Sequence, residues 1–243
     1  MARILLIDTS TAVLSVGLAL DGTVVEERVC TEARQQASLT APLVKEVLDA
    51  QGLTVKDCDA ICVGSGPGSY TGLRVGVSTA KGLAFGAGKP LLAVGTLDIL
   101  AQSVIPNNPS VIPSNPSVIP SEVEGSPSFI IPMIDARRME VYTAVYSSAG
   151  EKLTPIQALV VKEDSFAEQL SAGPVLFVGD GAPKCREVIK HPNAEFREAA
   201  PLARYMAPLA QRAFDEGRFE DLAYFEPFYL KDFVATVSKK NLW

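Results

Sequence analysis

Two segments of this chain share one layout, and that layout limits the folds open to it. Near the N-terminus, LLIDTSTAVLSVGLAL consists of an apolar strand, an aspartate in a short polar turn, and a strand of alternating apolar residues. PMIDARRMEVYTAVYS repeats that order in the second half with little sequence identity. Such internal repetition predicts a duplicated α/β fold in which Asp8 and Asp135 occupy equivalent hairpin turns.

A glycine-rich segment, GSGPGSYTGLRVG at residues 64–76, separates an apolar strand from a helix expected over residues 73–86. Strand, glycine turn and helix is a layout that brings backbone N–H groups close to an anion or to other backbone. The segment matches neither GxGxxG nor GxxxxGK[ST], so it carries no standard nucleotide motif.

Small residues recur every fourth position through this helix. They are Gly72, Gly76, Ala80 and Ala84. The stripe would let a partner helix approach closely, or it would pack on the chain's own sheet, and both interpretations stay open here.

An earlier helix is expected to begin at a cap formed by Ser38 or Thr40, with Pro42 in its first turn, and to end near Gln51. Four apolar residues would share one face of it: Leu39, Leu43, Val47 and Ala50.

Composition excludes several classes of function. The single histidine, His191, rules out metal sites built on two or more histidines and disfavours a Ser-His-Asp triad. A net charge of −6 argues against binding of a nucleic-acid backbone by this chain alone. Four cysteines in mainly apolar settings favour buried thiols over a disulfide framework. No apolar run reaches transmembrane length, so we expect a cytoplasmic protein that does not contact membranes.

The chain divides into three expected parts: a first lobe at residues 1–104, an insertion at 105–128, and a second lobe at 129–243. The insertion contains NPSVIPS twice in succession. Its prolines fix φ and remove N–H donors, which predicts an extended, mobile surface segment rather than a helix or central strand.

Three features together resemble the superfamily of actin, sugar kinases and heat-shock ATPases. They are Ile-Asp-Thr-Ser-Thr in the first hairpin, Ile-Asp-Ala-Arg in the second, and Val-Gly-Asp-Gly-Ala after a late strand. The resemblance implies two ribonuclease-H-like α/β lobes, each offering an Asp-bearing hairpin to phosphate. Within that superfamily, GSGPGSYTGLRVGVSTAKGLA, PMIDARRMEVY and EPFYLKD resemble the TsaB (YeaZ) family, and the likeness covers nearly all the chain outside residues 105–128.

The family resemblance implies a non-catalytic subunit of the bacterial machinery that makes N6-threonylcarbamoyladenosine beside the tRNA anticodon. The family pairs with TsaD, which transfers the threonylcarbamoyl group and carries a metal-binding HxxxH pair. The family resemblance also implies a larger complex with TsaE, only indirect contact with tRNA, and a homodimer when this chain is alone. Pairing runs through the first two helices, and the matching positions here are Leu39, Leu43, Val47, Gly72, Leu73, Gly76, Val77 and Ala80.

The superfamily resemblance also implies a candidate nucleotide or anion site. Its matching positions are Asp8, Thr9, Ser10, Gly66, Gly68, Ser69, Asp135, Arg137, Gly179 and Gly181. Bulky Arg137 and Arg138 after Asp135 would crowd a nucleotide, and the charge of Asp180 would oppose a phosphate. We therefore expect no cofactor on this chain alone, with ATP and magnesium belonging to the complex. Two alternatives remain: a small-molecule kinase or ATPase using Asp8 and Asp135, and a peptidase, which the single histidine disfavours.

Overall fold

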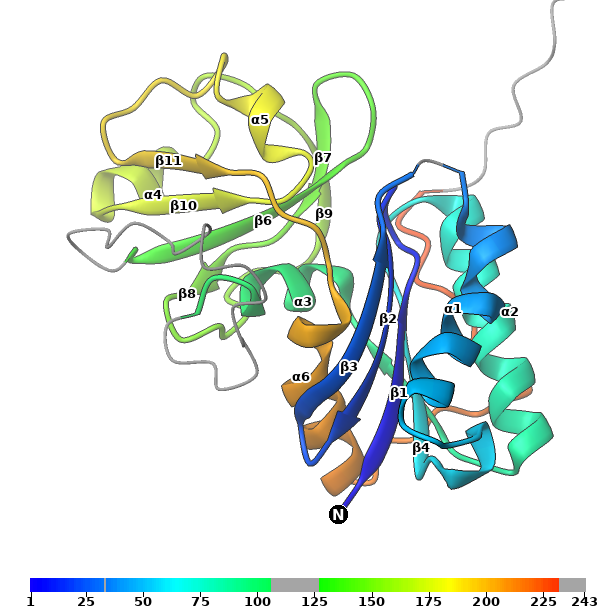
Figure 1. Ribbon diagram of the computed structural model, residues 1–243. Helices are drawn as coiled ribbons and strands as arrows, with labels where there is room; N and C mark the ends of the chain where they lie inside the picture. Colours follow the sequence, from blue (N-terminus) through cyan, green and yellow to red (C-terminus); the bar gives the residue numbers. More distant parts are fainter. Residues whose placement is uncertain (33, 106–126, 232–243) are drawn as a thin grey trace, which may run out of the picture.

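The first half of the protein is built on a five-stranded mixed sheet (Figure 1). The structure, a computed structural model, describes residues 1–32, 34–105 and 127–231. The sheet has the order β3-β2-β1-β4-β5, in which β1 is antiparallel to β2 and parallel to β4. Its strands are β1 (Arg3–Asp8), β2 (Leu14–Leu20), β3 (Thr23–Cys30), β4 (Ala60–Gly64) and β5 (Leu91–Val94).

The second half repeats this topology. Its sheet has the order β11-β10-β6-β7-β9, and β8 pairs with β6 off that path. Here β6 takes the place of β1, because it is antiparallel to β7 and parallel to β10. The strands are β6 (Phe129–Asp135), β7 (Glu140–Thr143), β8 (Tyr146–Ser147), β9 (Gln157–Val160), β10 (Val175–Val178) and β11 (Ala194–Arg197). The duplication predicted from the two Asp-bearing hairpins is confirmed.

The helices lie on the faces of these sheets. They are α1 (Gln36–Ala50), the 3₁₀ turn η1 (Val55–Asp57), α2 (Tyr70–Ala87), α3 (Thr96–Gln102), α4 (Ala167–Ala172), α5 (Ala182–Cys185) and α6 (Ala203–Asp215). Helix α1 begins before the expected caps, so Pro42 lies in its second turn and the prediction of a first-turn proline is wrong. Helix α2 begins at Tyr70 because the Ser69 side chain accepts the N–H of Gly72 at 3.3 Å and caps it.

Each half places its last helix on the other half's sheet. Helix α3 follows β5, yet its Leu97 and Leu100 pack in a cluster with Ile130 of β6 and Val178 of β10. Helix α6 follows β11, yet Ala203, Met206, Ala207 and Ala210 pack on Ile4 and Leu6 of β1. Figure 1 shows α3 and α6 between the two sheets. Each of these two helices therefore packs on the sheet of the other half of the chain.

Polar contacts fix α6 on the first sheet. The backbone N–H of Ala203 donates to the buried Ser15 Oγ at 2.8 Å. The Arg204 guanidinium pairs with Glu27 of β3, where Nε lies 2.7 Å from Oε2. These bonds set the position of the helix along the sheet. Most of the expected insertion, residues 106–126, lies outside the described residues.

Candidate functional site

The first Asp-bearing hairpin is enclosed by the chain itself. Asp8 is fully buried at the end of β1, and its Oδ1 accepts the N–H of Ser10 at 3.0 Å and the Ser10 hydroxyl at 2.8 Å. Its Oδ2 has no hydrogen-bond partner among the described residues. Desolvation by burial raises the pKa of Asp8 to about 7, against the opposing effect of the Ser10 bonds. The Asp8 carboxyl is therefore inaccessible to a ligand at the surface.

The glycine segment packs directly on that hairpin. Thr9 Oγ1 donates to the carbonyl of Gly72 at 2.7 Å, and the N–H of Ser69 donates to the carbonyl of Ser10 at 2.7 Å. A Cβ at Gly68 or Gly72 would come closer than 3.0 Å to a backbone carbonyl oxygen of this hairpin. The glycines here are required for close backbone contact, as one of the two interpretations of their spacing predicts.

The small-residue stripe belongs to the same contact, which is the packing within the chain that its spacing left open as one of two interpretations. A Cβ at Gly64 would meet Asp8 Oδ2 closer than 3.0 Å, and a side chain at Gly76 is already blocked by Thr9 Oγ1. Six of the eight predicted interface positions are buried within the chain: Val47, Gly72, Leu73, Gly76, Val77 and Ala80. Leu39 and Leu43 are half-buried against the same core. The stripe faces inward because α2 must approach the hairpin closely.

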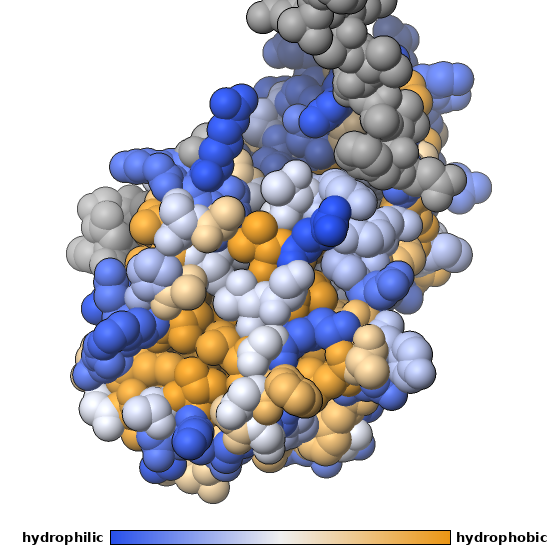
Figure 2. Space-filling model, turned by 90° about the vertical axis from the view of Figure 1, so that its right-hand side faces the viewer, coloured by the Kyte–Doolittle hydropathy of each residue, from blue (hydrophilic) through white to orange (hydrophobic). Residues whose placement is uncertain are grey.

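The outward face of α2 is a different set of residues. Ser78, Gly82, Phe85 and Gly86 are exposed, and Phe85 is 81% exposed. A Cβ built at Gly82 or Gly86 meets nothing within 4 Å. Figure 2 views the side of the molecule that carries α1 and α2, where hydrophobic residues gather in a patch.

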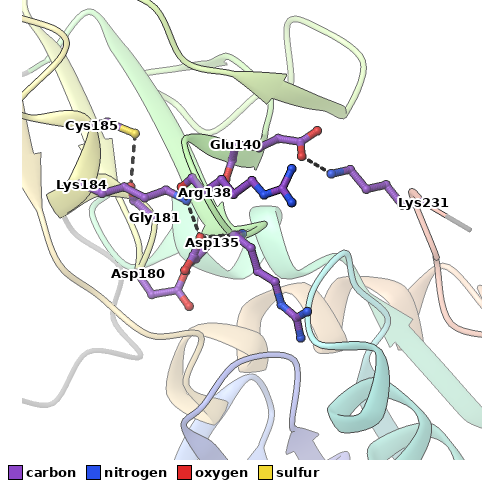
Figure 3. A network of polar contacts seen from close by, with 9 residues as sticks. Asp135, Arg138, Glu140, Asp180, Gly181, Lys184, Cys185 and Lys231 are labelled. Atoms are coloured by element: carbon purple, nitrogen blue, oxygen red, sulfur yellow. Dashed lines mark hydrogen bonds and ion pairs between the residues drawn. The ribbon is translucent and has the colours of Figure 1, made fainter. Parts of the chain in front are cut away.

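The second Asp-bearing hairpin is held by a polar network (Figure 3). Asp135 Oδ1 accepts the N–H of Arg137 at 2.8 Å and pairs with the Lys184 ammonium. The same ammonium donates to the carbonyls of Arg138 at 2.8 Å and Glu140 at 2.7 Å. Lys184 thus holds three oxygens of one turn together.

Asp180 supports this turn from the neighbouring strand end. Its Oδ1 accepts the N–H of Asp135 at 2.9 Å. Partial desolvation, with the nearby charge of Asp135, raises the pKa of Asp180 although solvent reaches much of its side chain. The flanking glycines serve backbone packing: a Cβ at Gly179 would collide with the Met133 carbonyl. The N–H of Gly181 donates to that carbonyl at 3.0 Å.

A cavity of about 570 Å³ lies between the two hairpins. It is lined by Ser10, Thr11, Ala12, Gly68, Ser69, Tyr70, Thr71, Ile134, Asp135, Ala136, Arg137, Tyr142, Asp180 and Lys231. Of the predicted nucleotide or anion positions, the cavity brings together Ser10, Gly68, Ser69, Asp135 and Arg137. Asp8, Thr9, Gly66, Gly179 and Gly181 do not line it, and Gly66 instead leaves room for the Phe228 carbonyl.

Sequence reasoning missed two cations of this region. Lys184 lies in a four-residue helix, and Lys231 is a surface residue that pairs with Glu140 and lies over the Tyr142 ring at 5.8 Å. Lys231 belongs to EPFYLKD, a segment that carries the family resemblance but indicates no site. Lys184 stands in no motif and binds mostly backbone carbonyls, which leave no trace in a sequence.

In residues 1–32, 34–105 and 127–231, no three His, Cys, Asp or Glu side chains are grouped so that they could hold a metal ion. The helices in those ranges are all too short or too polar to cross a bilayer.

The two sheets have one topology, and each carries an Asp-bearing hairpin beside a shared cavity. They define a two-lobe α/β protein with ribonuclease-H-like lobes and an actin-like ATPase fold. The family model for TsaD, tRNA N6-adenosine threonylcarbamoyltransferase, matches residues 30–239. The tRNA threonylcarbamoyladenosine biosynthesis protein TsaB of Escherichia coli K12 is 32% identical, covering 96% of each chain. The chain belongs to the TsaB family.

Two further similarities agree with this assignment. The structure described as YeaZ from Pseudomonas aeruginosa superposes with a TM-score of 0.77 at 28% identity, covering 95% of this chain and all of that one. The threonylcarbamoyltransferase of Sphingopyxis alaskensis is 47% identical over 66 residues, which cover 27% of this chain and 19% of that enzyme. The chain therefore shares local sequence with the transferase while matching TsaB along its length.

Proposed function

We propose that this chain is a non-catalytic scaffold subunit that pairs with TsaD for threonylcarbamoyl transfer to tRNA. Family membership supports a place in the biosynthesis of threonylcarbamoyladenosine. The pairing surface is the outward face of α1 and α2. This differs from the set of positions carried over from the family resemblance, most of which are occupied by the chain's own packing.

The exposed glycines of α2 carry this proposal. A glycine in a helix interior destabilises it by roughly 0.5–1 kcal/mol relative to alanine. Gly72 and Gly76 offset that cost through contact with the first hairpin, but Gly82 and Gly86 face open space. Their lack of side chains would let another backbone or helix approach closely from outside.

Hydrophobic exposure on the same face supports a protein partner. Phe85 stands between the two glycines in sequence and is 81% exposed. Burying a phenylalanine contributes roughly 1.5–3 kcal/mol to an association. Leu39 and Leu43 of α1 are half-buried and would add to the contact. An aromatic anchor beside small residues is suited to helix-on-helix packing.

The chemistry of the hairpins supports a scaffold over a kinase or ATPase. Asp8 is buried and bonded to Ser10, and Asp135 is paired with Lys184, so neither carboxylate is free to hold magnesium. We further propose that TsaE joins the assembly, that tRNA is contacted through TsaD, and that the free chain forms a homodimer through the same α1–α2 face.

The test is co-purification of the cognate TsaD with Gly82→Leu and Phe85→Asp variants. Both should lose at least tenfold in TsaD binding and in nucleoside modification while keeping the far-ultraviolet circular dichroism of the parent. Val160→Asp, a change at a 56% exposed residue of β9, is the control and should bind normally. Normal TsaD binding by both α2 variants would refute the proposed surface.

A further inference from the structure

A second cavity lies along the edge of β5, away from the α1–α2 face. Its volume of about 320 Å³ falls within the rough range of 300–1,000 Å³ for ligand sites. This edge cavity is bounded by β5, α3, α6 and the turn at residues 149–150. Figure 1 shows α6 on one face of the first sheet and the pair α1 and α2 on the other. Binding in the edge cavity is therefore separate from pairing with TsaD through the α1–α2 face.

Strand β5 is an edge strand with one free hydrogen-bonding position. The carbonyls of Pro90 and Val94 accept N–H groups from the β4 side at 3.1 and 2.8 Å. Because successive residues of a strand direct their backbone groups to opposite sides, Leu91 and Ala93 direct theirs away from β4. The Leu91 carbonyl accepts the N–H of Glu220 at 2.8 Å. The N–H and the carbonyl of Ala93, which lines the cavity, have no partner in the part of the chain that the structure describes.

Two arginines line the edge cavity near the start of β5. Arg218 lies two residues before Glu220, which bridges the first residue of that strand. The N–H of Arg218 donates to the carbonyl of Ala213 at 2.9 Å, and Arg212 precedes Ala213 in α6. Arg218 is paired with Glu216, whereas the Arg212 guanidinium makes no hydrogen bond or ion pair with any described residue. A guanidinium fork matches the two oxygens of a carboxylate, so Arg212 can bind one at this end of the cavity.

A carboxylate lies at the other end of β5, and the chain itself already satisfies it. Asp98 stands in the first turn of α3, directly after β5, and lines the edge cavity. Its Oδ1 accepts the Tyr146 hydroxyl at 2.8 Å, and the Lys152 ammonium lies 3.0 Å from the same oxygen. Apolar side chains of α3 and α6 also line the cavity. The free charge that the cavity offers a ligand is therefore that of Arg212.

We propose that the edge cavity binds the free C-terminal end of an extended peptide, which pairs antiparallel with Ala93 and places its carboxylate on Arg212. In an antiparallel pair, two directly opposite residues exchange both hydrogen bonds, and Ala93 offers one donor and one acceptor for this exchange. A peptide in that direction carries its C-terminus to the start of β5, where the arginines lie. A parallel peptide would carry it to Asp98, a carboxylate. Backbone pairing at a sheet edge and capture of a terminal carboxylate are both recurrent modes of peptide recognition.

The test is titration of the whole chain, labelled with nitrogen-15, with the tripeptide acetyl-Ala-Val-Ala, followed by nuclear magnetic resonance. At millimolar concentration the tripeptide should shift the amide resonance of Ala93, because that N–H gains a hydrogen bond. The same tripeptide with a C-terminal amide should bind at least tenfold more weakly, because it lacks the charge-assisted contact. Acetate at the same concentration is the control for a carboxylate alone and should leave the Ala93 resonance in place.

Substitutions separate the backbone contact from the carboxylate contact. Ala93→Pro removes the unpaired N–H and should abolish tripeptide binding, followed through the Gly95 amide, which also lines the cavity. Ala93→Gly keeps that N–H and should bind within threefold of the parent. Arg212→Ala should weaken binding of the free-carboxylate tripeptide at least tenfold and leave binding of the amide form unchanged. Arg197→Ala changes an arginine of β11 that does not line the cavity, and it should bind as the parent does.

Several results would overturn the peptide site. They are unmoved Ala93 and Gly95 resonances at millimolar tripeptide, equal binding of the carboxylate and amide forms, and parental binding by a folded Ala93→Pro variant. A shift of the Ala93 resonance by acetate as large as that by the tripeptide would replace the peptide with a simple carboxylate. If Ala93→Pro fails to fold by circular dichroism, comparison of the two tripeptide forms on the parent and on Arg212→Ala still decides the outcome.

Discussion

The buried carboxyl of Asp8 predicts that the stability of this protein falls as the pH rises from about 4 to about 7. The ordinary pKa is 3.8, and burial raises the folded-state value to about 7. Between these values the folded protein holds a proton that the unfolded chain has released. Each pH unit in that interval then lowers the free energy of unfolding by about 1.4 kcal/mol, and above the folded pKa the loss is constant.

Asp8→Asn isolates this effect, since asparagine keeps the shape and the acceptor for Ser10 but does not titrate. In the parent, ionisation of this one group lowers the free energy of unfolding at pH 8 by roughly 4 kcal/mol relative to acid pH, because the two pKa values differ by about three pH units at about 1.4 kcal/mol each. The variant's stability relative to the parent should rise steadily from pH 5 to pH 7 and level off above it. The constant difference in free energy of unfolding between variant and parent includes the cost of desolvating the new N–H₂ group. The dependence of that difference on pH is therefore the quantity to measure.

Guanidinium unfolding at pH 5, 6, 7 and 8 provides the measurement. Asp49→Asn, which changes an exposed aspartate of α1 paired with Lys45, is the control and should run parallel to the parent, because exposed ion pairs contribute about 0–1 kcal/mol. Parallel curves for Asp8→Asn and the parent across this interval would refute the reasoning, since they would mean that Asp8 ionises in the folded state as it does in water.

Two other substitutions test the packing. Gly76→Leu should destabilise the free chain by roughly 2–4 kcal/mol in urea unfolding, because its side chain would enter the space of Thr9; a folded, fully stable variant would contradict the inward orientation of the stripe. Tyr146→Phe should lower stability by about 1–2 kcal/mol, because the buried Tyr146 hydroxyl donates to Asp98 Oδ1 at 2.8 Å and joins β8 to α3. An unchanged urea midpoint for this variant would show that Lys152, at 3.0 Å from Asp98, satisfies the carboxylate alone.

The sequence was sufficient for the duplicated architecture, because each strand–Asp–turn–strand unit is a local pattern. It was not sufficient to assign the small-residue stripe. The four-residue spacing of the small side chains indicates that another segment packs closely on α2. It does not identify that segment as the turn at Thr9, which is more than sixty residues away in the sequence. The start of α1 was misplaced for a related reason: its N-cap, Gln35, makes no side-chain cap bond, so the helix begins without the usual signal.

The candidate site was only partly predictable. Asp135 and Arg137 stand beside a recognisable strand end and do line the cavity. Asp8 stands at the equivalent strand end but is buried, because the glycine segment covers the first hairpin, whereas Asp135 is exposed. Lys184 completes the second turn from a different strand–helix unit, so only the fold brings it there.

The exchange of α3 and α6 between the sheets makes the two halves parts of one folding unit. Residues 1–105 include α3, whose apolar side chains pack on the second sheet, and residues 127–231 include α6, which covers the first. A backbone cut between these ranges would leave each fragment with an uncovered sheet face and the helix that the other fragment needs. The fragments should therefore reassociate, and the intact chain should melt in one cooperative transition rather than lobe by lobe.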